Sequence, residues 1–392
     1  MNRFILFAVA VIVFTLANIV PAMAVEPIRV IVDGKDLSFD VSPKLENGRL
    51  MVPMRAIFEA LDVQVEWDNV TNTIIGENLI TKGSNIKLVV GRKTAYINDK
   101  AVELDMPAKV IEGRVLVPLR FVAEALGGNV EWTAGSSVVN IDSGFLRTSL
   151  GEYRFWLNKS NDELNELFVA VGKSVPKKLT DLNLIIKYRP GDDPRPTLTA
   201  EKTSKGNVLL TAINNYGEPH VFNNVHSIYV NLANNTLQKA SLHYAFRFED
   251  NIKFYKEQII LTDGKKIIFI DDNTGTISKT INYKELPGEG HQEQDGEEES
   301  YFIEGMGENY LIIRPNNSGI LTLIDLKNNQ NIQLYKKLLG KEEQEFAETN
   351  DVPYKGDWLK FIGQKGNLLQ FKNENTIIGP DTSIYTYPVP GN

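Results

Sequence analysis

A gapless internal duplication constrains the fold of this chain more than any other sequence feature. The segment 113–132, which runs from Gly-Arg-Val-Leu-Val-Pro-Leu-Arg to Val-Glu-Trp, repeats the segment 48–67. Both ends of the match have the same offset (113 − 48 = 65 and 132 − 67 = 65), so nothing has been inserted inside it. About half of the positions agree, which chance does not produce, and any fold must therefore contain two copies of one unit.

One copy is predicted to form a strand, a short helix and a second strand. Apolar residues at 115–117 indicate the first strand, and Pro118 suits the first helical turn because its missing N–H would have no partner there. Helical spacing then places four apolar residues on one face: Leu119, Val122, Ala123 and Leu126. Gly127-Gly128 predicts the helix end. The first copy has Asp62-Val63 there, so its helix is expected to end less cleanly.

Each copy also has a hairpin in front of it. Residues 29–35 form a strand pattern that leads into an Asp-Gly turn, and residues 93–100 repeat this pattern with an Asn-Asp turn. One short helix on a few strands buries too little apolar surface to be stable alone. The two copies are therefore expected to pack together.

The motifs Val-Pro-x-Arg, Glu-Ala-Leu and Val-x-Trp, present twice, resemble those of the copper amine oxidase N-terminal-like domain, also called the stalk domain. The resemblance covers about residues 28–143 and implies an α+β module found in secreted and surface proteins of Gram-positive bacteria. The name comes from a stalk of an oxidase and not from its catalytic part. The resemblance is therefore specific for the module but gives almost no information about activity.

The N-terminus predicts export. Met1-Asn2-Arg3 is positively charged, residues 4–20 are largely apolar, and Ala22-Met23-Ala24 is typical of a signal-peptide cleavage site. The alternative is an uncleaved membrane anchor, but Pro21 and Asn18 shorten the apolar run below the roughly 20 residues that a spanning helix needs. We expect a signal peptide over 1–24 and no membrane span after its cleavage. The mature protein is expected to be secreted or at the cell surface.

Composition excludes several classes of function. The chain of 392 residues has 42 Lys and Arg against 50 Asp and Glu, and this acidic balance argues against nucleic acid as a partner. It has no cysteine, which excludes disulfides, thiol nucleophiles, cysteine-based zinc sites and a lipoprotein anchor. Its length suggests about two or three domains.

Residues 144–200 are predicted to hold a helix and a linker. Ser160 and Glu163 have the spacing of a helix start. Apolar residues follow at helical spacing, at Leu164, Leu167, Phe168 and Val171. Residues 189–196 are rich in proline and are expected to form a loop.

Residues 201–392 are predicted to form a β-rich domain. An alternative start of this domain lies near residue 150. Apolar runs are each followed by a turn rich in Asn, Asp or Gly, at 214–217, 233–236, 271–275, 327–330 and 372–375. The last three turns recur every 45–55 residues or so, close to the length of one propeller blade. The expected fold is a degenerate β-propeller, with a β-sandwich as the alternative.

Arg55 and Arg120 are the first candidate binding residues, because they occupy matching places in the two copies. Glu59 and Glu124 follow four residues later, so each pair can meet on one helix face. One interpretation is that the guanidinium groups hold an anionic ligand such as a wall polymer. The favoured interpretation is an internal ion pair, or an Arg that bonds strand-end carbonyl groups.

Trp67 and Trp132 are the second pair of candidates. They could act as stacking platforms for carbohydrate, since an aromatic face suits the apolar face of a sugar. Both lie on alternating strand patterns, and we therefore expect them to pack in the core.

The remaining candidates for catalysis or metal binding are histidines and acidic residues. The catalytic part of the copper amine oxidases needs a His-x-His pair on copper, and the four histidines here, His220, His226, His243 and His291, contain none. Asp271 to Gly275 resembles a calcium loop but is better explained as a hairpin turn. The acidic run 285–300 is expected to be a solvated loop. No catalytic, cofactor-binding or metal-binding residue is assigned, although paired carboxylates for glycoside hydrolysis need no local motif.

These observations predict an exported, non-catalytic protein of the cell envelope or medium, in which a stalk-like module presents a β-rich binding domain. The expected partner is a cell-envelope polymer or envelope protein, with no cofactor. One alternative is an extracellular propeller-type hydrolase or lyase that acts on wall glycans or peptides. Another is a structural envelope component.

Overall fold

A computed structural model describes residues 27–80, 85–132, 136–159, 164–186, 195–217, 221–245, 250–288, 293–294, 297–350, 355–375, 377 and 382–391. The predicted signal peptide, residues 1–24, lies outside the described residues. The chain divides into two compact units, the first made of residues up to 78 and 83–141, the second of 79–82 and 142–392. Of the helices in the described part, none has the length and apolar character needed to cross a membrane.

The first unit contains the predicted duplication. The first repeat consists of β1 (Arg29–Val32), β2 (Lys35–Asp36), β3 (Lys44–Glu46), β4 (Arg49–Pro53), α2 (Met54–Ala60), β5 (Val63–Asp68) and β6 (Thr73–Asn78). The second consists of β8 (Thr94–Ile97), β9 (Lys100–Glu103), β10 (Lys109–Ile111), β11 (Arg114–Pro118), α3 (Leu119–Ala125), β12 (Asn129–Trp132) and β13 (Val138–Asp142). The starts of β4 and β11 (114 − 49 = 65) and of α2 and α3 (119 − 54 = 65) keep the sequence offset. Both copies therefore have the same order of elements.

The two repeats share their sheets. The closing hairpin of the second repeat joins the opening hairpin of the first in the order β12-β13-β1-β2, through a parallel pairing of β1 with β13. The other two hairpins join through β7 (Asn85–Val89) in the order β5-β6-β7-β8-β9. In the third sheet, β10-β11-β4-β3, Val52 is paired with Val117 and the flanking partners repeat symmetrically. An approximate two-fold axis therefore relates the repeats.

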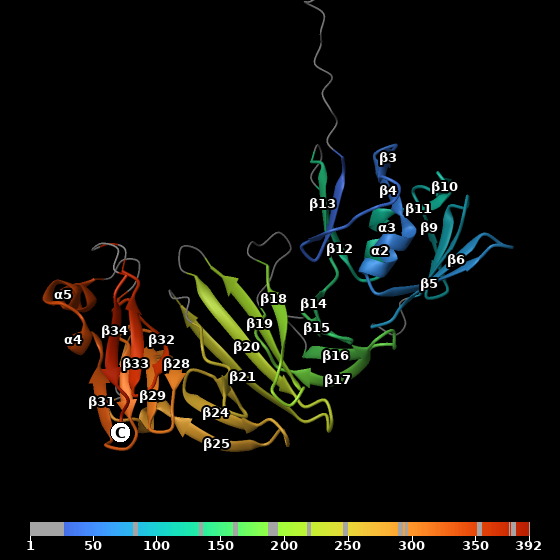
Figure 1. Cartoon of the computed structure of the whole chain (residues 1–392). Helices are drawn as coiled ribbons and strands as arrows, with labels where there is room; N and C mark the ends of the chain where they lie inside the picture. The colour runs from blue at the N-terminus through green and yellow to red at the C-terminus, as the bar shows by residue number, and fades with distance from the viewer. Residues whose placement is uncertain are drawn as a thin grey trace, which may run out of the picture. The chain divides into compact units, whose positions relative to one another are not determined.

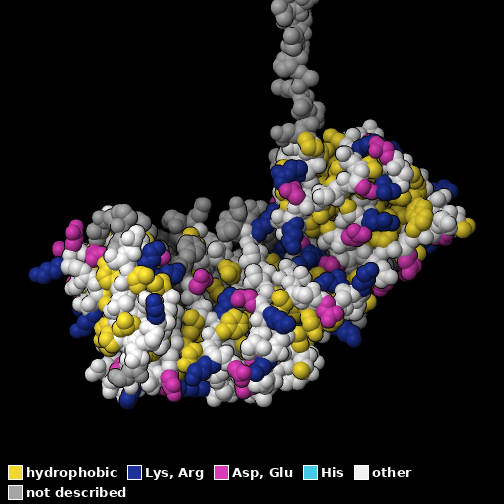
Figure 2. All heavy atoms as spheres, viewed as in Figure 1, with side chains coloured by type: hydrophobic (Ala, Val, Ile, Leu, Met, Phe, Trp, Pro, Cys, Tyr) yellow, Lys and Arg dark blue, Asp and Glu magenta, His cyan; other side chains and the backbone are white. Residues whose placement is uncertain are grey.

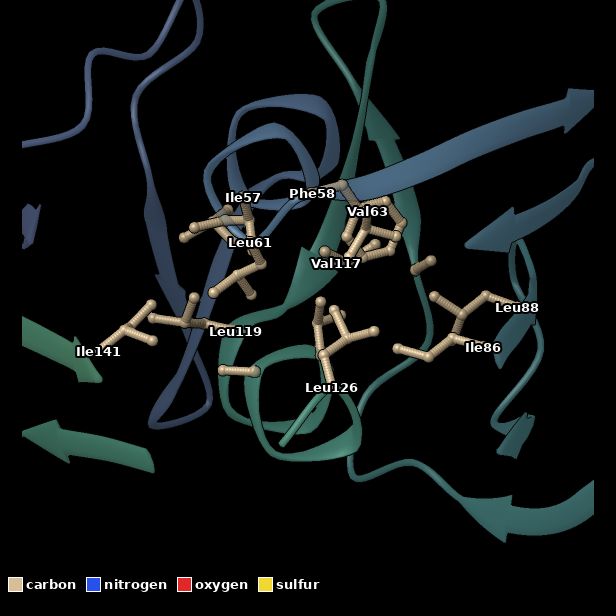
Figure 3. Close-up of a cluster of buried hydrophobic side chains, with 14 of the residues drawn as sticks. Ile57, Phe58, Leu61, Val63, Ile86, Leu88, Val117, Leu119, Leu126 and Ile141 are labelled. Atoms are coloured by element: carbon tan, nitrogen blue, oxygen red, sulfur yellow. The ribbon is translucent and has the colours of Figure 1, made fainter. Parts of the chain in front are cut away.

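The core of this unit lies between the two helices and the strands around them. Figure 3 shows side chains from α2, α3, β7 and β11 converging on one cluster. Ile57 and Phe58 of α2 and Val122 of α3 have no exposed surface. Burying each such side chain contributes about 1.5–3 kcal/mol to folding. Both helices thus need the shared core, because neither has enough apolar surface of its own.

The helix ends differ from expectation. We expected the end of α2 to be less defined, because Asp62 stands where the second copy has Gly127. Instead α2 and α3 have the same length, and Asp62 adopts a left-handed backbone conformation (φ 55°) as Gly127 does (φ 84°). Aspartate tolerates this conformation better than most residues. The expectation was therefore wrong.

The second unit is built from small antiparallel sheets (Figure 1). Its first two sheets hold β14 (Phe145–Leu150), β15 (Tyr153–Asn158), β16 (Asn165–Val171), β17 (Lys177–Leu182), β18 (Thr197–Lys202), β19 (Val208–Tyr216), β20 (Phe222–Val230) and β21 (Leu237–Ala245). The third holds β22 (Phe254–Tyr255), β23 (Gln258–Thr262), β24 (Lys266–Asp271) and β25 (Ile277–Asn282). The last two hold β28 (Tyr301–Met306), β29 (Tyr310–Pro315), β30 (Thr322–Asp325), β31 (Gln330–Gln333), β32 (Leu359–Lys365), β33 (Leu368–Asn373) and β34 (Ile384–Pro388). The strands follow chain order within every one of these sheets.

Shorter elements lie between these sheets. They are a hairpin of β26 (Glu293–Gln294) and β27 (Glu297–Glu298), a 3-10 turn η1 (Tyr283–Glu285), and two helices, α4 (Tyr335–Leu338) and α5 (Lys341–Thr349). The described part of the chain is therefore mainly β.

Each sheet of the second unit packs on the next one in the chain. On β19, Leu210 joins the cluster shared with the preceding sheet, while its neighbour Leu209 joins the cluster shared with the following sheet. On β29, Ile313 and Ile312 divide between two clusters in the same way. A strand buried on both faces has a continuous apolar run instead of an alternating one. This explains the runs that the sequence shows. The β-sandwich alternative does not fit, because a sandwich has two packed sheets.

Two local predictions in this unit were wrong. The helix start predicted at Ser160 to Glu163 lies outside the described residues. The rest of that predicted helix, from Leu164 to Val171, contains the strand β16, in which Leu167 and Phe168 join different clusters on opposite faces. Because both faces are buried, the apolar positions lost the alternation that would have distinguished a strand from a helix. The turn prediction fails at two places. The turn predicted at 214–217 begins later, since Asn214 and Asn215 still belong to β19, and the turn predicted at 372–375 begins later, since Lys372 and Asn373 still belong to β33.

Candidate functional site

A pocket of about 250 Å³ lies within the first unit and gathers residues from both repeats. The second repeat contributes Arg120 and Glu124 from α3 and Trp132 from β12. Arg49, at the start of β4, Glu103, the last residue of β9, and Asp105, which follows β9, complete the charged part of its lining. The residues that the duplication singled out in the second copy are therefore brought together in one concave site.

The floor of this pocket is apolar. It is formed by buried side chains from four elements or their flanks: Leu50, Leu104, Leu119 and Val139. Phe121 and Trp132 are half-buried and pack against the main core of the unit. The indole N–H of Trp132 donates a hydrogen bond to the backbone oxygen of Ser136 at 3.0 Å. This bond fixes the ring and uses its one polar atom, so Trp132 offers a ligand only carbon surface.

The rim of the pocket carries two ion pairs. Arg49 Nε contacts Asp105 Oδ2 at 2.5 Å, and Arg120 Nε lies 3.8 Å from Glu124 Oε1. All four side chains are more than half exposed, between 52% and 65%. Ion pairs this exposed stabilise a fold by only about 0–1 kcal/mol. A ligand can therefore replace these contacts, of which only Arg49–Asp105 is a hydrogen bond, at little cost to the fold.

The approximate two-fold axis predicts a counterpart of this site in the first repeat. There Arg114 forms an ion pair with Asp40, and both residues keep the offset from Arg49 and Asp105 (114 − 49 = 65 and 105 − 40 = 65). The hydrogen bond from Arg114 holds the pKa of Asp40 below its ordinary value. The matching tryptophan is Trp67, which is 42% exposed.

The arginine and glutamate predictions had mixed outcomes. The internal ion pair that we favoured is present between Arg120 and Glu124. Arg55 and Glu59 are both exposed, and no ion pair joins these two described residues. The same helical spacing therefore produced the contact in only one copy.

The core-packing prediction holds for one tryptophan and fails for the other. Trp132 packs against the core, whereas Trp67 is exposed. Trp67 lies next to the turn that contains Val70, which is 86% exposed, and this end of β5 extends past the core. The prediction for Trp67 was wrong because strand alternation assigns a face but does not say how far the covering layer reaches.

Sequence reasoning missed the ion pair of Arg49 with Asp105. A signal was present, since Gly-Arg opens both copies of the motif and an aspartate stands at 40 and again at 105. Because these arginines and aspartates recur with the offset of 65 residues, the sequence could have indicated that each arginine pairs with an aspartate. What the sequence does not give is that Arg49 of the first copy reaches a pocket of the second.

In the second unit, a buried carboxylate joins two sheets. The Asp272 side chain accepts hydrogen bonds from Ser204 Oγ (3.0 Å), the Lys205 backbone N–H (2.8 Å), Asn207 Nδ2 (3.0 Å) and Tyr229 OH (3.1 Å). Burial raises the pKa of Asp272, but these donors outweigh it and the net pKa is lowered. Such a fully bonded carboxylate holds sheets together and is poorly suited to proton transfer.

A buried arginine joins the last two sheets in a similar way. Arg314 Nε bonds Glu304 Oε1 at 2.5 Å, and its two terminal nitrogens reach Asp357 Oδ1 (3.2 Å) and the backbone oxygens of Gly319 (2.6 Å) and Leu359. Burial raises the pKa of Asp357, although the nearby guanidinium of Arg314 opposes this. The charges of this cluster compensate one another inside the protein.

The histidines do not gather into a site in the described residues. His226 is fully buried, with Nδ1 2.8 Å from Ser241 Oγ and Nε2 3.0 Å from the Ile185 backbone oxygen, and burial lowers its pKa to about 4. Its ring lies 5.7 Å from that of His243. His220 and His291 lie outside the described residues. Within the described ranges no group of three or more His, Cys, Asp or Glu could hold a metal ion.

The turn at Asp271 is a hairpin turn, as predicted. Asp271 Oδ1 accepts the backbone N–H groups of Asn273 and Thr274, each at 2.9 Å. Asp325 and Asn231 form equivalent bonds in the corresponding turns of neighbouring sheets. Of the acidic run 285–300, residues 289–292 and 295–296 lie outside the described residues. Glu299 is described and is buried, so the prediction of a solvated loop was wrong at that residue.

Charged side chains of both signs are interspersed on the face of the molecule seen in Figure 2. No large area of one sign appears there. The net charge of −8 is thus not concentrated in one patch on this face.

The comparisons with known proteins identify part of the first unit. Residues 31–141 match the family model of the copper amine oxidase N-terminal domain. This confirms the resemblance that the motifs indicated. The match covers less than a third of the chain and ends where the second unit begins.

Solved structures are similar to this chain only weakly. Apo AztD from Citrobacter koseri is 11% identical, over 69% of this chain and 84% of that one, with a TM-score of 0.21. BamB from Moraxella catarrhalis is 10% identical, over 87% and 83%, with a TM-score of 0.23. A puromycin hydrolase is 11% identical, over 88% and 51%, with a TM-score of 0.24. Scores this low establish neither a shared fold nor a shared function.

Proposed function

We propose that this chain is an exported, non-catalytic protein of the cell envelope that binds an envelope polymer. The observation that carries this proposal is the open pocket of the first unit, with its aromatic floor and exposed ion pairs. By contrast, the buried charges of Asp272 and Arg314 in the second unit are engaged in hydrogen bonds that join sheets. An accessible site with exchangeable bonds suits binding, while catalysis needs a perturbed group that faces substrate.

The binding site in this proposal is on the stalk-like module, whereas the sequence led us to expect it on the β-rich unit, which is here the body attached to the module. For that body we propose a degenerate β-propeller. Its support is the series of small antiparallel sheets in chain order, each packed on the next through its own apolar cluster. Blades of four strands are the building unit of propellers.

Sedimentation with purified cell walls tests the binding function. The mature chain is mixed with peptidoglycan from a Gram-positive wall, and the bound fraction is measured after centrifugation. Saturable binding is expected. A chain that stays in solution at all wall concentrations would leave the structural alternative, and turnover of wall glycans in the same mixture would support the hydrolase alternative instead.

A further inference from the structure

The pocket of the first unit has a size that limits its ligand. Pockets for drug-sized ligands measure about 300–1,000 Å³. At about 250 Å³ this pocket suits one unit of a polymer, such as a single sugar ring, with the rest of the chain outside. Because only one unit of the polymer enters the pocket, the length of the polymer is not limited by the size of the pocket.

The floor of the pocket suits a flat ligand with an apolar face. Trp132 and Phe121 present aromatic carbon there, and the only polar atom of the indole already bonds Ser136. The C–H groups on one face of a pyranose ring pack well against such a surface. The aliphatic side chains beside the aromatic rings extend the same apolar surface.

The rim suits hydroxyl groups. A hydroxyl both donates and accepts, so it can donate to a carboxylate and accept from a guanidinium group at the same time. The ion pairs Arg49–Asp105 and Arg120–Glu124 offer this combination twice, and all four side chains are exposed. A sugar ring has hydroxyl groups around its edge, which is the kind of group that these two pairs suit.

The charge of the lining argues against a polyanion. Two arginines are balanced by three acidic residues, since Glu103 joins Asp105 and Glu124. A phosphate polymer would gain little net attraction from this lining, because the lining has one more acidic than basic side chain. The binding of an uncharged ligand is not weakened by this charge balance.

On these grounds, and resting on the binding function proposed above, we propose that the pocket around Trp132 binds one uncharged pyranose ring of a polysaccharide. Trp132 stacks on the ring, and the two rim ion pairs bond its hydroxyl groups. The corresponding place in the first repeat differs at six lining positions. Three of them change the character of the lining, since Ala56, Ser38 and Phe39 stand in place of Phe121, Glu103 and Leu104. The other three exchange one aliphatic or Met side chain for another, with Val115, Met54 and Ile74 in place of Leu50, Leu119 and Val139. Trp67 therefore provides a matched control.

Isothermal titration calorimetry of the full mature chain with tri-N-acetylchitotriose and with cellotriose tests this proposal. At least one of these neutral sugars is expected to bind with 1:1 stoichiometry. Trp132→Ala should weaken binding about tenfold or more, as the loss of an aromatic contact does. Trp67→Ala should leave it unchanged.

A second pair of variants covers the case in which Trp132→Ala fails to fold. Glu124→Gln changes only an exposed rim residue, and Glu59→Gln is its counterpart in the first repeat. The first should weaken sugar binding about threefold or more, since one charge-assisted bond is lost, and the second should not.

Several results would overturn the proposal. They are the absence of heat with both sugars, equal losses for Trp67→Ala and Trp132→Ala, and Trp132-dependent binding of polyphosphate or trialanine instead. If walls sediment the protein while neither sugar binds, only this ligand assignment fails. If walls do not sediment it, the broader binding function fails.

Discussion

Single residues in this protein are constrained most where two backbones approach closely. Gly356 has φ 113°, and a Cβ atom there would lie 2.3 Å from the backbone oxygen of Gly319. Neither backbone can move without disturbing Arg314, which bonds that same oxygen. Glycine is therefore required at position 356 for two reasons: a side chain has no room there, and the backbone has a positive φ.

We predict that Gly356→Ala lowers the free energy of unfolding by about 2–4 kcal/mol, because strain and a backbone clash add up. Gly366→Ala is the matched control, since Gly366 also has a positive φ (58°) but open space around it. It should cost only about 1 kcal/mol. Urea denaturation of both variants measures the difference, and equal costs would show that the clash has no effect.

Glu299 is a buried acid in the run 285–300, which the sequence predicts to be a solvated loop. Its side chain is part of a residue only 7% exposed, and Oε1 accepts the backbone N–H groups of Ser300 (3.0 Å) and Asn317 (2.9 Å). Its other oxygen has no hydrogen-bond partner. Burial therefore raises the pKa of this carboxyl group above its ordinary value of 4.5.

A raised carboxyl pKa means that the folded state holds this proton more tightly than the unfolded state. Its contribution to stability is greatest below the unfolded pKa and is lost as the pH rises through the folded pKa. We predict that Glu299→Gln raises the free energy of unfolding by about 1 kcal/mol at pH 7, because no buried charge is left. At pH 4 the gain should vanish. Denaturation at both pH values tests this, with the exposed Glu308→Gln as control; a gain that is the same at pH 4 would contradict it.

The two duplicated helices end in the same backbone conformation with two different residues. Both helices end in a left-handed residue, Asp62 in the first repeat and Gly127 in the second. Glycine adopts this conformation without strain, aspartate with a small cost and β-branched residues with a large one. The helix end therefore requires a left-handed backbone conformation at this position, and either glycine or aspartate can supply it.

We predict that Gly127→Asp costs only about 0.5–1 kcal/mol, whereas Gly127→Val costs about 2 kcal/mol or more. A Cβ atom at Gly127 meets nothing within 4 Å, so conformation alone decides the difference. Thermal unfolding monitored by circular dichroism distinguishes the two variants. If aspartate and valine were equally costly, the left-handed cap would not be the cause.

The contact between the last two sheets depends on one charged cluster. Arg314 has a 3% exposed side chain and faces Glu304 (7%) and Asp357 (0%). Removing the cation leaves two acids buried without compensation. An ion pair at the surface, such as Lys372 with Glu374, has no such dependence because water solvates both partners.

We predict that Arg314→Met lowers the free energy of unfolding by about 3–5 kcal/mol. Lys372→Met should change it by less than about 1 kcal/mol. Guanidinium denaturation followed by tryptophan fluorescence measures both. A loss under about 1 kcal/mol for Arg314→Met would mean that hydrogen bonds from water replace the guanidinium group.

The whole molecule has two compact units with separate apolar cores. The main cluster of the first unit contains residues from 30 to 141 only, and the larger clusters of the second contain residues from 146 onward. Cores that share no residues can melt separately.

We predict that differential scanning calorimetry shows two transitions. Phe58→Ala in the first core should lower one transition, and Phe371→Ala in the second unit should lower the other, because each creates a cavity that costs about 3–5 kcal/mol. Each variant serves as the control for the other. If both lowered the same single transition, the two units would unfold as one cooperative body.

Local sequence patterns determined the duplication, the strand-helix-strand order of each repeat and most strand-turn-strand units after 200, because these depend on residues close together in the chain. The helix predicted at 164–171 failed for the same reason, since local periodicity does not reveal that β16 is covered on both faces. Only the tertiary structure decided that β1 pairs with β13, that Arg49 of one repeat shares a pocket with Trp132 of the other, and that Trp67 stays exposed. Those outcomes depend on contacts between residues far apart in sequence, and such contacts are set by how the layers pack and how far they extend.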